Sequence, residues 1–319
     1  MNRRFALIQA LVSLIALAAV VWWATKQEPP EFPSGGEAIA WLVGALAFYA
    51  VATLLRGERW HQILRLTDVD ARRSDCYALT TVGYMGNNVL PARAGEILRV
   101  VLLSNRTGAS KRTLLGSVVA ERMLDVIALA SIFVVVVYGV LSSTVLPTDR
   151  PLLFGGLILL GLLLACACLY VLRRHHVFER VRAWLRPLAD APRALLCRQG
   201  VALLAGTFVL WAFEAAVYLA VARAVDLDIS GMGALYLVAL TNFFAALPAA
   251  PGSIGTFDAA VIFGSKAIGA SGSAALSYLL TLRFVLYVPI TAVGFVVLVT
   301  RYGGWSRLRT AVRLEASRA

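Results

Sequence analysis

Apolar runs of membrane-spanning length recur along this chain and leave it few ways to fold. Hydrophobic residues make up 60% of its 319 residues, and the mean hydropathy is +0.77. In lipid a helix satisfies its own backbone hydrogen bonds, so the composition predicts an all-α, polytopic integral membrane protein. No polar stretch is long enough for a soluble domain, and we expect residues 1–319 to form one transmembrane domain. The expected full spans lie near residues 6–24, 37–55, 113–140, 151–172, 201–222 and 274–300.

Two further apolar segments, 77–104 and 232–269, are interrupted by the same phrase. L-P-A-x-x-G occurs at residues 90–95 and again at 247–252, 157 residues later. Pro removes a backbone donor and Gly permits turns that other residues resist. Paired interruptions in corresponding positions of two halves point to a transporter-type binding site, whereas the alternative is two ordinary helix kinks. We predict two re-entrant helical hairpins within an inverted repeat. The expected repeats are residues about 37–172 and 201–300, with a basic tail at 301–319.

Lys and Arg residues cluster in alternate loops. Residues 1–5, 56–75, 105–112, 173–200 and 301–319 carry 22 of the 30, and the opposite loops hold little beyond Lys26, Arg150 and Arg223. The positive-inside rule then predicts a multi-pass protein of the cell (inner, cytoplasmic) membrane with both termini in the cytoplasm. The first hairpin must enter from the cytoplasm and the second from outside. The first apolar run ends at Trp22 and Trp23 rather than at a cleavage site, so we expect it to be retained as a helix.

Ten charged residues fall inside the apolar segments. A charge that faces lipid at the centre of a helix costs about 2.5–3.5 kcal/mol, so most of them must be paired, hydrated or near an interface. The equal numbers of the two signs favour pairing around an internal polar cavity. The basic residues are Arg93, Arg99, Arg122, Lys266 and Arg283, and the acidic residues are Glu96, Glu121, Asp125, Glu214 and Asp258.

Two of the arginines, Arg122 and Arg283, each lie nine residues into a predicted span, at a depth of about 13 Å from opposite faces. The planar fork of arginine suits phosphate. After each L-P-A-x-x-G a half-helix directs free N–H groups and a positive dipole end toward the cavity. The residues that we expect to bind a lipid phosphate are Arg93, Arg99, Arg122, Arg283, Ser253 and Thr256. Charge balance or proton coupling is assigned to Glu96, Glu121, Asp125, Glu214 and Asp258.

Several other chemistries are not indicated. The chain has no Walker A phrase, no G-x-S-x-G and no H-E-x-x-H, and its four cysteines lack zinc or redox spacing. We therefore expect no metal, no cofactor and no catalytic residue. The net charge of +12 lies beside the spans, which favours anionic lipid over nucleic acid as the partner. Basic cytoplasmic loops are expected to hold His61, His175, His176, Cys76 and Cys197.

Four phrases carry a family resemblance: GYMGNNVLPARAGEILRVVLLS, GSVVAERMLD, LPAAPGSIGTFDAA and LSYLLTLRFVLYVP. They resemble the lysylphosphatidylglycerol synthase transmembrane, or flippase-like, family over residues 37–300. The resemblance implies lipid translocation. It speaks against lysyl transfer, because the soluble aminoacyltransferase domain of the namesake proteins is expected to be absent. One departure is Asp258, where Glu is more usual. The resemblance marks hairpin-turn residues Asn88, Pro91, Gly95, Pro248, Pro251, Gly252 and Gly255.

These observations predict a transporter that moves an anionic lipid between leaflets. The cargo would be a phospholipid or a polyprenyl-phosphate conjugate. One alternative is an integral-membrane transferase that acts on a lipid phosphate, with Glu96 or Asp258 as the base. Another is a scaffold subunit whose partner is a lipid-modifying enzyme. The short loops disfavour the enzyme, since it would need a site for a soluble co-substrate, and a scaffold would not need ten buried charges.

Overall fold

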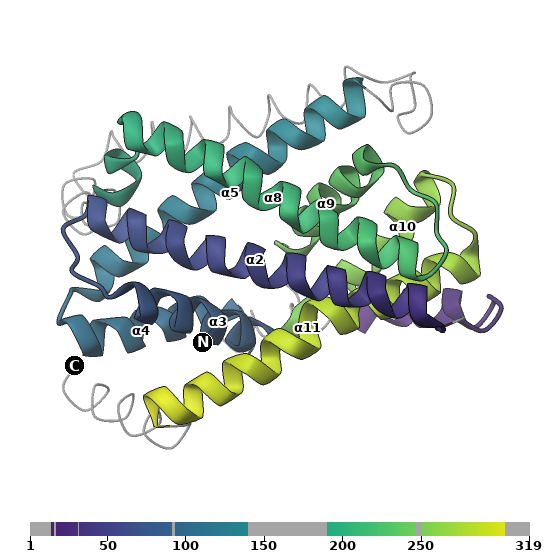
Figure 1. Ribbon diagram of the computed structural model, residues 1–319, viewed down its shortest axis with the longest axis horizontal. Helices are drawn as coiled ribbons and strands as arrows, with labels where there is room; N and C mark the ends of the chain where they lie inside the picture. The colour runs from purple at the N-terminus through teal and green to yellow at the C-terminus, as the bar shows by residue number, and fades with distance from the viewer. Residues whose placement is uncertain are drawn as a thin grey trace.

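The computed structural model of the chain describes residues 14–303 apart from 16, 31, 91–92, 140–189 and 247–249. Within these residues the protein is a bundle of helices with no strand, which confirms the all-α prediction (Figure 1). The elements are α2 (Gly36–Leu66), α3 (Arg73–Val89), α4 (Gly95–Thr107), α5 (Lys111–Gly139), α8 (Arg198–Ala224), α9 (Gly231–Ala245), the 3-10 turn η2 (Pro251–Ser253), α10 (Thr256–Ala267) and α11 (Gly272–Tyr302).

Three of these helices, α2, α8 and α11, are long and apolar enough to cross a membrane. They contain the predicted spans 37–55, 201–222 and 274–300. The predicted span 113–140 coincides with α5, whose middle carries Glu121, Arg122 and Asp125. The prediction 151–172 and residues 6–13 and 16 of the prediction 6–24 lie outside the described residues, so the number of spans stays a prediction.

The predicted end of the helix that contains the span 37–55 was wrong. We placed residues 56–75 in a cytoplasmic loop, but α2 continues without a break to Leu66. Arg56, Arg59 and His61 are buried in this extension, and Cys76 is buried in α3. The helix continues because carboxylates on α5 and α8 neutralise its arginines, so these charges do not have to end the buried segment.

Each L-P-A-x-x-G phrase lies at the turn of a helical hairpin. The first falls between α3 and α4, and the second between α9 and α10, where η2 also lies. Within each hairpin the two helices pack against each other. The turns use left-handed backbone at Arg93, Gly252, Ser253 and Gly255, with φ of 53°, 66°, 50° and 88°. Pro91 and Pro248 lie outside the described residues.

The packing of the first half recurs in the second. The pairs α2 with α3, α3 with α4, α4 with α5 and α2 with α5 have as counterparts α8 with α9, α9 with α10, α10 with α11 and α8 with α11. The turns that follow α2 and α8 also match. Thr67 and Val225 both have φ −111° and ψ 20°. Asp68 and Asp226, which follow them, have φ of 56° and 53°. The D-x-D phrases at residues 68–70 and 226–228 were a signal of this repeat that the sequence analysis missed.

The two halves run in opposite directions. Figure 1 shows α2 and α8 side by side and antiparallel, with α3 and α4 toward one end of the bundle and α9 and α10 toward the other. This arrangement is the one that an inverted repeat requires. The entry of each hairpin from a particular membrane face stays a prediction.

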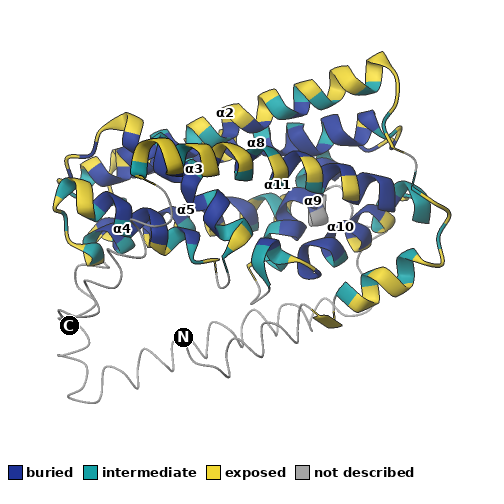
Figure 2. Cartoon of the chain, turned by 90° about the horizontal axis from the view of Figure 1, so that it is seen from below, coloured by how far each residue is buried: buried dark blue, intermediate teal, exposed yellow. Residues whose placement is uncertain are grey.

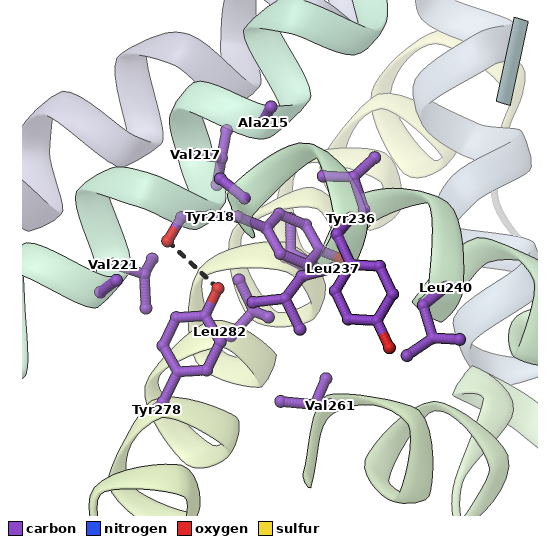
Figure 3. Packing of buried hydrophobic residues seen from close by; sticks show 14 of the residues in the cluster. Ala215, Val217, Tyr218, Val221, Tyr236, Leu237, Leu240, Val261, Tyr278 and Leu282 are labelled. Carbon is purple, nitrogen blue, oxygen red and sulfur yellow. Dashed lines mark hydrogen bonds between the residues drawn. The ribbon is translucent and has the colours of Figure 1, made fainter. Parts of the chain in front are cut away.

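The end of the bundle that holds α9 and α10 is closed by apolar packing. Tyr218, Tyr236 and Tyr278 are fully buried there among aliphatic side chains (Figure 3). The Tyr278 hydroxyl donates to the Tyr218 carbonyl at 3.2 Å. Large apolar residues such as Phe284 and Phe295 are instead exposed. Exposed residues lie on the outer faces of the helices (Figure 2), as expected for contact with lipid.

The predicted orientation can be tested by labelling three exposed positions. Single cysteines at Ser110, Asp190 and Ser271 are accessible, and the native cysteines, including the exposed Cys197, are first replaced by serine. We expect an impermeant thiol reagent to label Ser271→Cys from outside the cell, and the other two only after permeabilisation. Labelling of Ser271→Cys only from the cytoplasmic side would contradict the inverted topology.

Candidate functional site

The tips of the two hairpins meet in the middle of the bundle. The amide of Asn88, at the tip of α3, donates to the Thr291 hydroxyl on α11 at 2.9 Å. Arg93, just after the first break, donates to the carbonyl of Ala245 at the end of α9 at 3.2 Å. A side chain added at Gly252 would come within 3.5 Å of the Asn88 carbonyl. The two L-P-A-x-x-G phrases are therefore neighbours in space.

A polar cavity of about 110 Å³ lies at this meeting point. Two charged residues line it, Arg93 and Glu214. The rest of the lining is mostly neutral hydrogen-bonding groups, including the amides of Asn87, Asn88 and Asn242 and the phenols of Tyr49, Tyr84, Tyr218 and Tyr287. Aside from the Tyr218 hydroxyl, which bonds to Thr241 at 2.7 Å, these phenol groups have no hydrogen-bond partner among the described residues. They are therefore available to a polar ligand.

A mostly apolar groove of about 630 Å³ adjoins the cavity on one side. We call it the α5 groove. Its polar part is formed by Arg93, Glu96 and Arg122, and apolar residues of α4 and α5 line the remainder, from Leu115 on one side of Arg122 to Ile127 on the other. Arg93 lines both the cavity and this groove.

A second mostly apolar groove, of about 730 Å³, adjoins the cavity on another side. We call it the α11 groove. It runs along α11 from Arg283 to Phe295 and is completed by the tip of α3 and by η2. Asn88, Gly252 and Tyr287 line both this groove and the cavity. Arg301, near the end of α11, donates to the Ser74 carbonyl at the start of α3, so the α11 groove extends toward the end of the bundle where α3 begins.

A chain of ion pairs runs inward from the α5 groove. Glu96 lies between Arg93 at 3.8 Å and Arg122 at 3.6 Å. Arg122 also contacts Asp125 at 3.4 Å. Arg59 is 2.7 Å from Asp125 and 3.8 Å from Glu121, and Glu121 pairs with Arg99. Pairing is thus the means by which these charges are held inside the bundle.

A shorter version of this arrangement occurs in the second half. Arg283 pairs with Asp258 and also donates to the carbonyls of Gly252 and Ser253 at 3.3 and 3.4 Å. Asp258 caps α10 by accepting from the Gly255 N–H at 2.8 Å. The guanidinium group lies 4.8 Å from the ring centre of Tyr287, its neighbour one turn along the helix.

The two arrangements correspond in position. Arg122 lies eleven residues after the first residue of α5, and Arg283 eleven after the first residue of α11, which is about 16 Å along each axis. The carboxylates that face them, Glu96 and Asp258, each lie in the first turn of the half-helix after L-P-A-x-x-G. Each half thus places one arginine against the start of its half-helix.

The predicted phosphate-binding residues do not form one cluster. Arg93 and Ser253 line the cavity, Arg122 the α5 groove and Arg283 the α11 groove. Arg99 is buried against Glu121, and its guanidinium lies 4.5 Å from the Trp60 ring centre. Thr256 is buried, and its hydroxyl donates to the Ser253 carbonyl at 3.3 Å. The acidic candidates are all paired, and Lys266 lies 5.5 Å from the Trp23 ring centre.

Arg56 and Arg59 belong to the ion pairs of the site, although their sequence position beside a basic loop did not indicate it. Arg56 pairs with Glu214 at 3.0 Å, across 158 residues of sequence. The sequence held a signal of this, because residues 45–66 contain no Pro and a single Gly, Gly57, so nothing in them ends a helix before the two arginines. The cavity-lining tyrosines were also missed, since an aromatic residue in an apolar span reads as core.

Comparison with known proteins shows what this architecture belongs to. Residues 7–294 match the lysylphosphatidylglycerol synthase TM region. The chain belongs to this family. The phrases that carried the resemblance lie on α3 and α4, on α5, on η2 and α10, and on α11, and so they surround the cavity and both grooves. The protein is therefore a multi-pass helical membrane protein of a family associated with lipid handling.

Three relatives are similar to this chain, two of them over most of their own length. A UPF0104 membrane protein of Methanothermobacter thermautotrophicus is 23% identical over 318 residues, which cover 90% of this chain and 93% of that protein. Another UPF0104 membrane protein, of Methanocaldococcus jannaschii, is 21% identical over 212 residues, or 65% of this chain and 90% of that protein. Glycosyltransferase AglD of Haloferax volcanii is 29% identical over 145 residues, which cover 44% of this chain and 23% of that protein.

Proposed function

We propose that this protein moves an anionic lipid between the leaflets of the membrane. The observation that carries the proposal is the junction of two apolar grooves with one polar cavity, each groove presenting an arginine close to the junction. A lipid has the same division into apolar chains and a polar headgroup. The grooves suit acyl or prenyl chains, and the cavity suits the headgroup.

Different arginines contact the phosphate from the two grooves. Arg122 and Arg93 receive it from the α5 groove, and Arg283 receives it from the α11 groove. Each has contacts that hold its guanidinium in place, and each is partly exposed, with side-chain accessibilities of 38%, 42% and 22%. A guanidinium fork held in place on a partly exposed side chain is suited to bidentate phosphate binding.

The α11 groove extends toward the end of the bundle where α3 begins, the α5 groove runs along α5 from Leu115 to Ile127, and apolar packing around Tyr218, Tyr236 and Tyr278 fills the part of the bundle that holds α9 and α10. This arrangement corresponds to the state that loads lipid from one leaflet, the cytoplasmic one in the predicted topology. An inverted repeat supplies the complementary state, because exchange of conformations between the halves would close this end and open the other.

The transferase alternative is less well supported by the same contacts. Glu96 lies between two arginines, and Asp258 accepts from Arg283 and from a backbone N–H. These donors already occupy the carboxylate oxygens that a general base would present to a substrate. The similarity to glycosyltransferase AglD covers 23% of that protein and by itself identifies no residue that would carry out group transfer.

The proposal is tested in vesicles that contain the purified protein and a fluorescent phosphodiester lipid. A membrane-impermeant quencher reaches only outer-leaflet lipid, so we expect nearly complete quenching with the protein and a plateau without it. Mass spectrometry of the recovered lipid should find it chemically unchanged. Modified lipid that appears only with a soluble co-substrate would instead establish the transferase, and a plateau equal to that of empty vesicles would overturn transport.

A further inference from the structure

One carboxylate differs from the other four that the sequence offers for proton coupling. Among the described residues, Glu214 is the acidic residue that lines the central cavity. Glu96, Glu121 and Asp125 each contact two arginines, and Asp258 combines an arginine with a backbone N–H. Glu214 contacts one arginine, Arg56, through a single oxygen. Of the five, Glu214 therefore has the fewest donors, and it is the one that lines the cavity.

Arg56 does not depend on Glu214 alone for its position. Its guanidinium lies 5.5 Å from the ring centre of Tyr84 and 5.4 Å from that of Trp211. Both residues of the ion pair are buried, at 6% and 7% exposure. If Glu214 loses its charge, Arg56 therefore stays behind the cavity wall as a positive charge available to another anion.

The groups that face this pair from the neighbouring helices are mostly neutral phenols. Tyr49 comes from α2, Tyr84 from α3, Tyr218 from α8 and Tyr287 from α11. The nearby charges are Arg93, which lines the same cavity, and Asp125 of α5, whose carboxylate attracts the Arg56 guanidinium electrostatically. The cavity is small, so an anion held there by Arg93 would lie close to the Glu214 carboxylate. Two negative charges that share one site favour protonation of one of them.

We infer that Glu214 is a proton-binding residue, and that binding of an anionic headgroup in the cavity is coupled to uptake of one proton by its carboxylate. The proton comes from water, and no covalent bond in the lipid changes. The phosphodiester then replaces the Glu214 carboxylate as the anion that balances the charge of Arg56. When the lipid is released, Glu214 gives its proton back to water. This inference rests on the proposed function and specifies how the same site is driven, since a proton gradient would then act on lipid binding.

The test measures proton uptake by the full-length protein in detergent. The probe is dihexanoyl phosphatidylglycerol, whose phosphodiester keeps one negative charge from about pH 5 to 8. Calorimetric titrations in buffers of different ionisation enthalpy should show uptake approaching one proton per lipid. Affinity should fall up to about tenfold for each pH unit in the window where free Glu214 is ionised and bound Glu214 is protonated.

Two variants localise the effect. Glu214→Gln should bind the probe with no proton uptake and with little pH dependence, at an affinity similar to that of the wild type at low pH. Asp75→Asn is the matched control, since Asp75 is a buried carboxylate that pairs with Arg106 and Arg301 away from the cavity, and its uptake should equal that of the wild type.

The outcomes separate this inference from the proposed function. Wild-type binding without proton uptake would overturn the inference and leave transport standing, and so the test does not depend on folding of the variants. Uptake that persists in Glu214→Gln would also overturn it. Binding with proton uptake in a protein that moves no lipid in vesicles would overturn transport alone, and no binding from pH 5 to 8 would overturn both.

Discussion

Replacing Arg283 with alanine should lower folding stability and lipid movement together. The side chain of its partner Asp258 is 6% exposed and would be left as an unpaired buried carboxylate. Removing one member of a buried ion pair costs about 3–5 kcal/mol. The same change also removes the donor that the α11 groove presents to a phosphate. The measurements are thermal unfolding in detergent and the vesicle quenching assay.

A double variant separates these two effects. Asp258→Asn keeps an oxygen that can accept from the Gly255 N–H and removes the carboxylate charge. We therefore expect Arg283→Ala with Asp258→Asn to recover most of the lost stability but not lipid movement. Recovery of both by the double variant would show that Arg283 acts only as a partner for Asp258. Arg283→Lys should recover movement only in part, because an ammonium group lacks the bidentate fork.

Arg122→Ala provides the comparison from the first half. Its two partners each keep another arginine, Arg93 for Glu96 and Arg59 for Asp125. Stability should therefore change by only about 1 kcal/mol or less. Lipid binding should weaken by about 1.5–3 kcal/mol, the range for a hydrogen bond to a charged group. Unchanged lipid binding in both alanine variants would refute the assignment of these arginines to the phosphate.

The second large effect is expected at Gly95. A Cβ there would lie 1.9 Å from the carbonyl oxygen of Gly83 and 2.5 Å from the amide nitrogen of Asn87, so α3 and α4 could no longer pack at this distance. Overpacking of this kind costs about 1–3 kcal/mol for small insertions, and the contacts here are with backbone that cannot rotate away. Gly95→Ala should lower the melting temperature, and Gly95→Leu should abolish lipid movement.

The matched control for Gly95 is Gly206→Ala on α8. No atom lies within 4 Å of the added Cβ there, and alanine is a better helix former than glycine. Its stability should be equal to the wild type or slightly higher. Gly252→Leu should abolish movement for a different reason, since φ is 66° and the side chain would enter the space beside Tyr287 and Asn88. Normal lipid movement in both leucine variants would mean that L-P-A-x-x-G is only a helix kink.

The sequence by itself determined the class of the protein and the places where its helices break. Apolar runs in lipid must be helical, and Pro with Gly interrupts a helix through local backbone geometry, so both conclusions needed no knowledge of distant residues. The repeated phrase also indicated two halves, and this division stays a prediction beside the matching helix pairs of the structure. Charge patterns gave an orientation for the membrane, which stays a prediction.

Only the tertiary structure decided which charges meet and which face a cavity. Sequence hydropathy ends the first described span before Arg56 and Arg59, because an arginine is costly in lipid. The helix continues because Glu214 and Asp125, 158 and 66 residues away, lie where they neutralise those charges. Similarly, Arg99 and Arg93 are six residues apart in sequence, yet one is buried against Glu121 and the other lines the cavity. Helical periodicity fixes the face on which a side chain lies, whereas the partner across that face comes from a distant segment that only folding brings close.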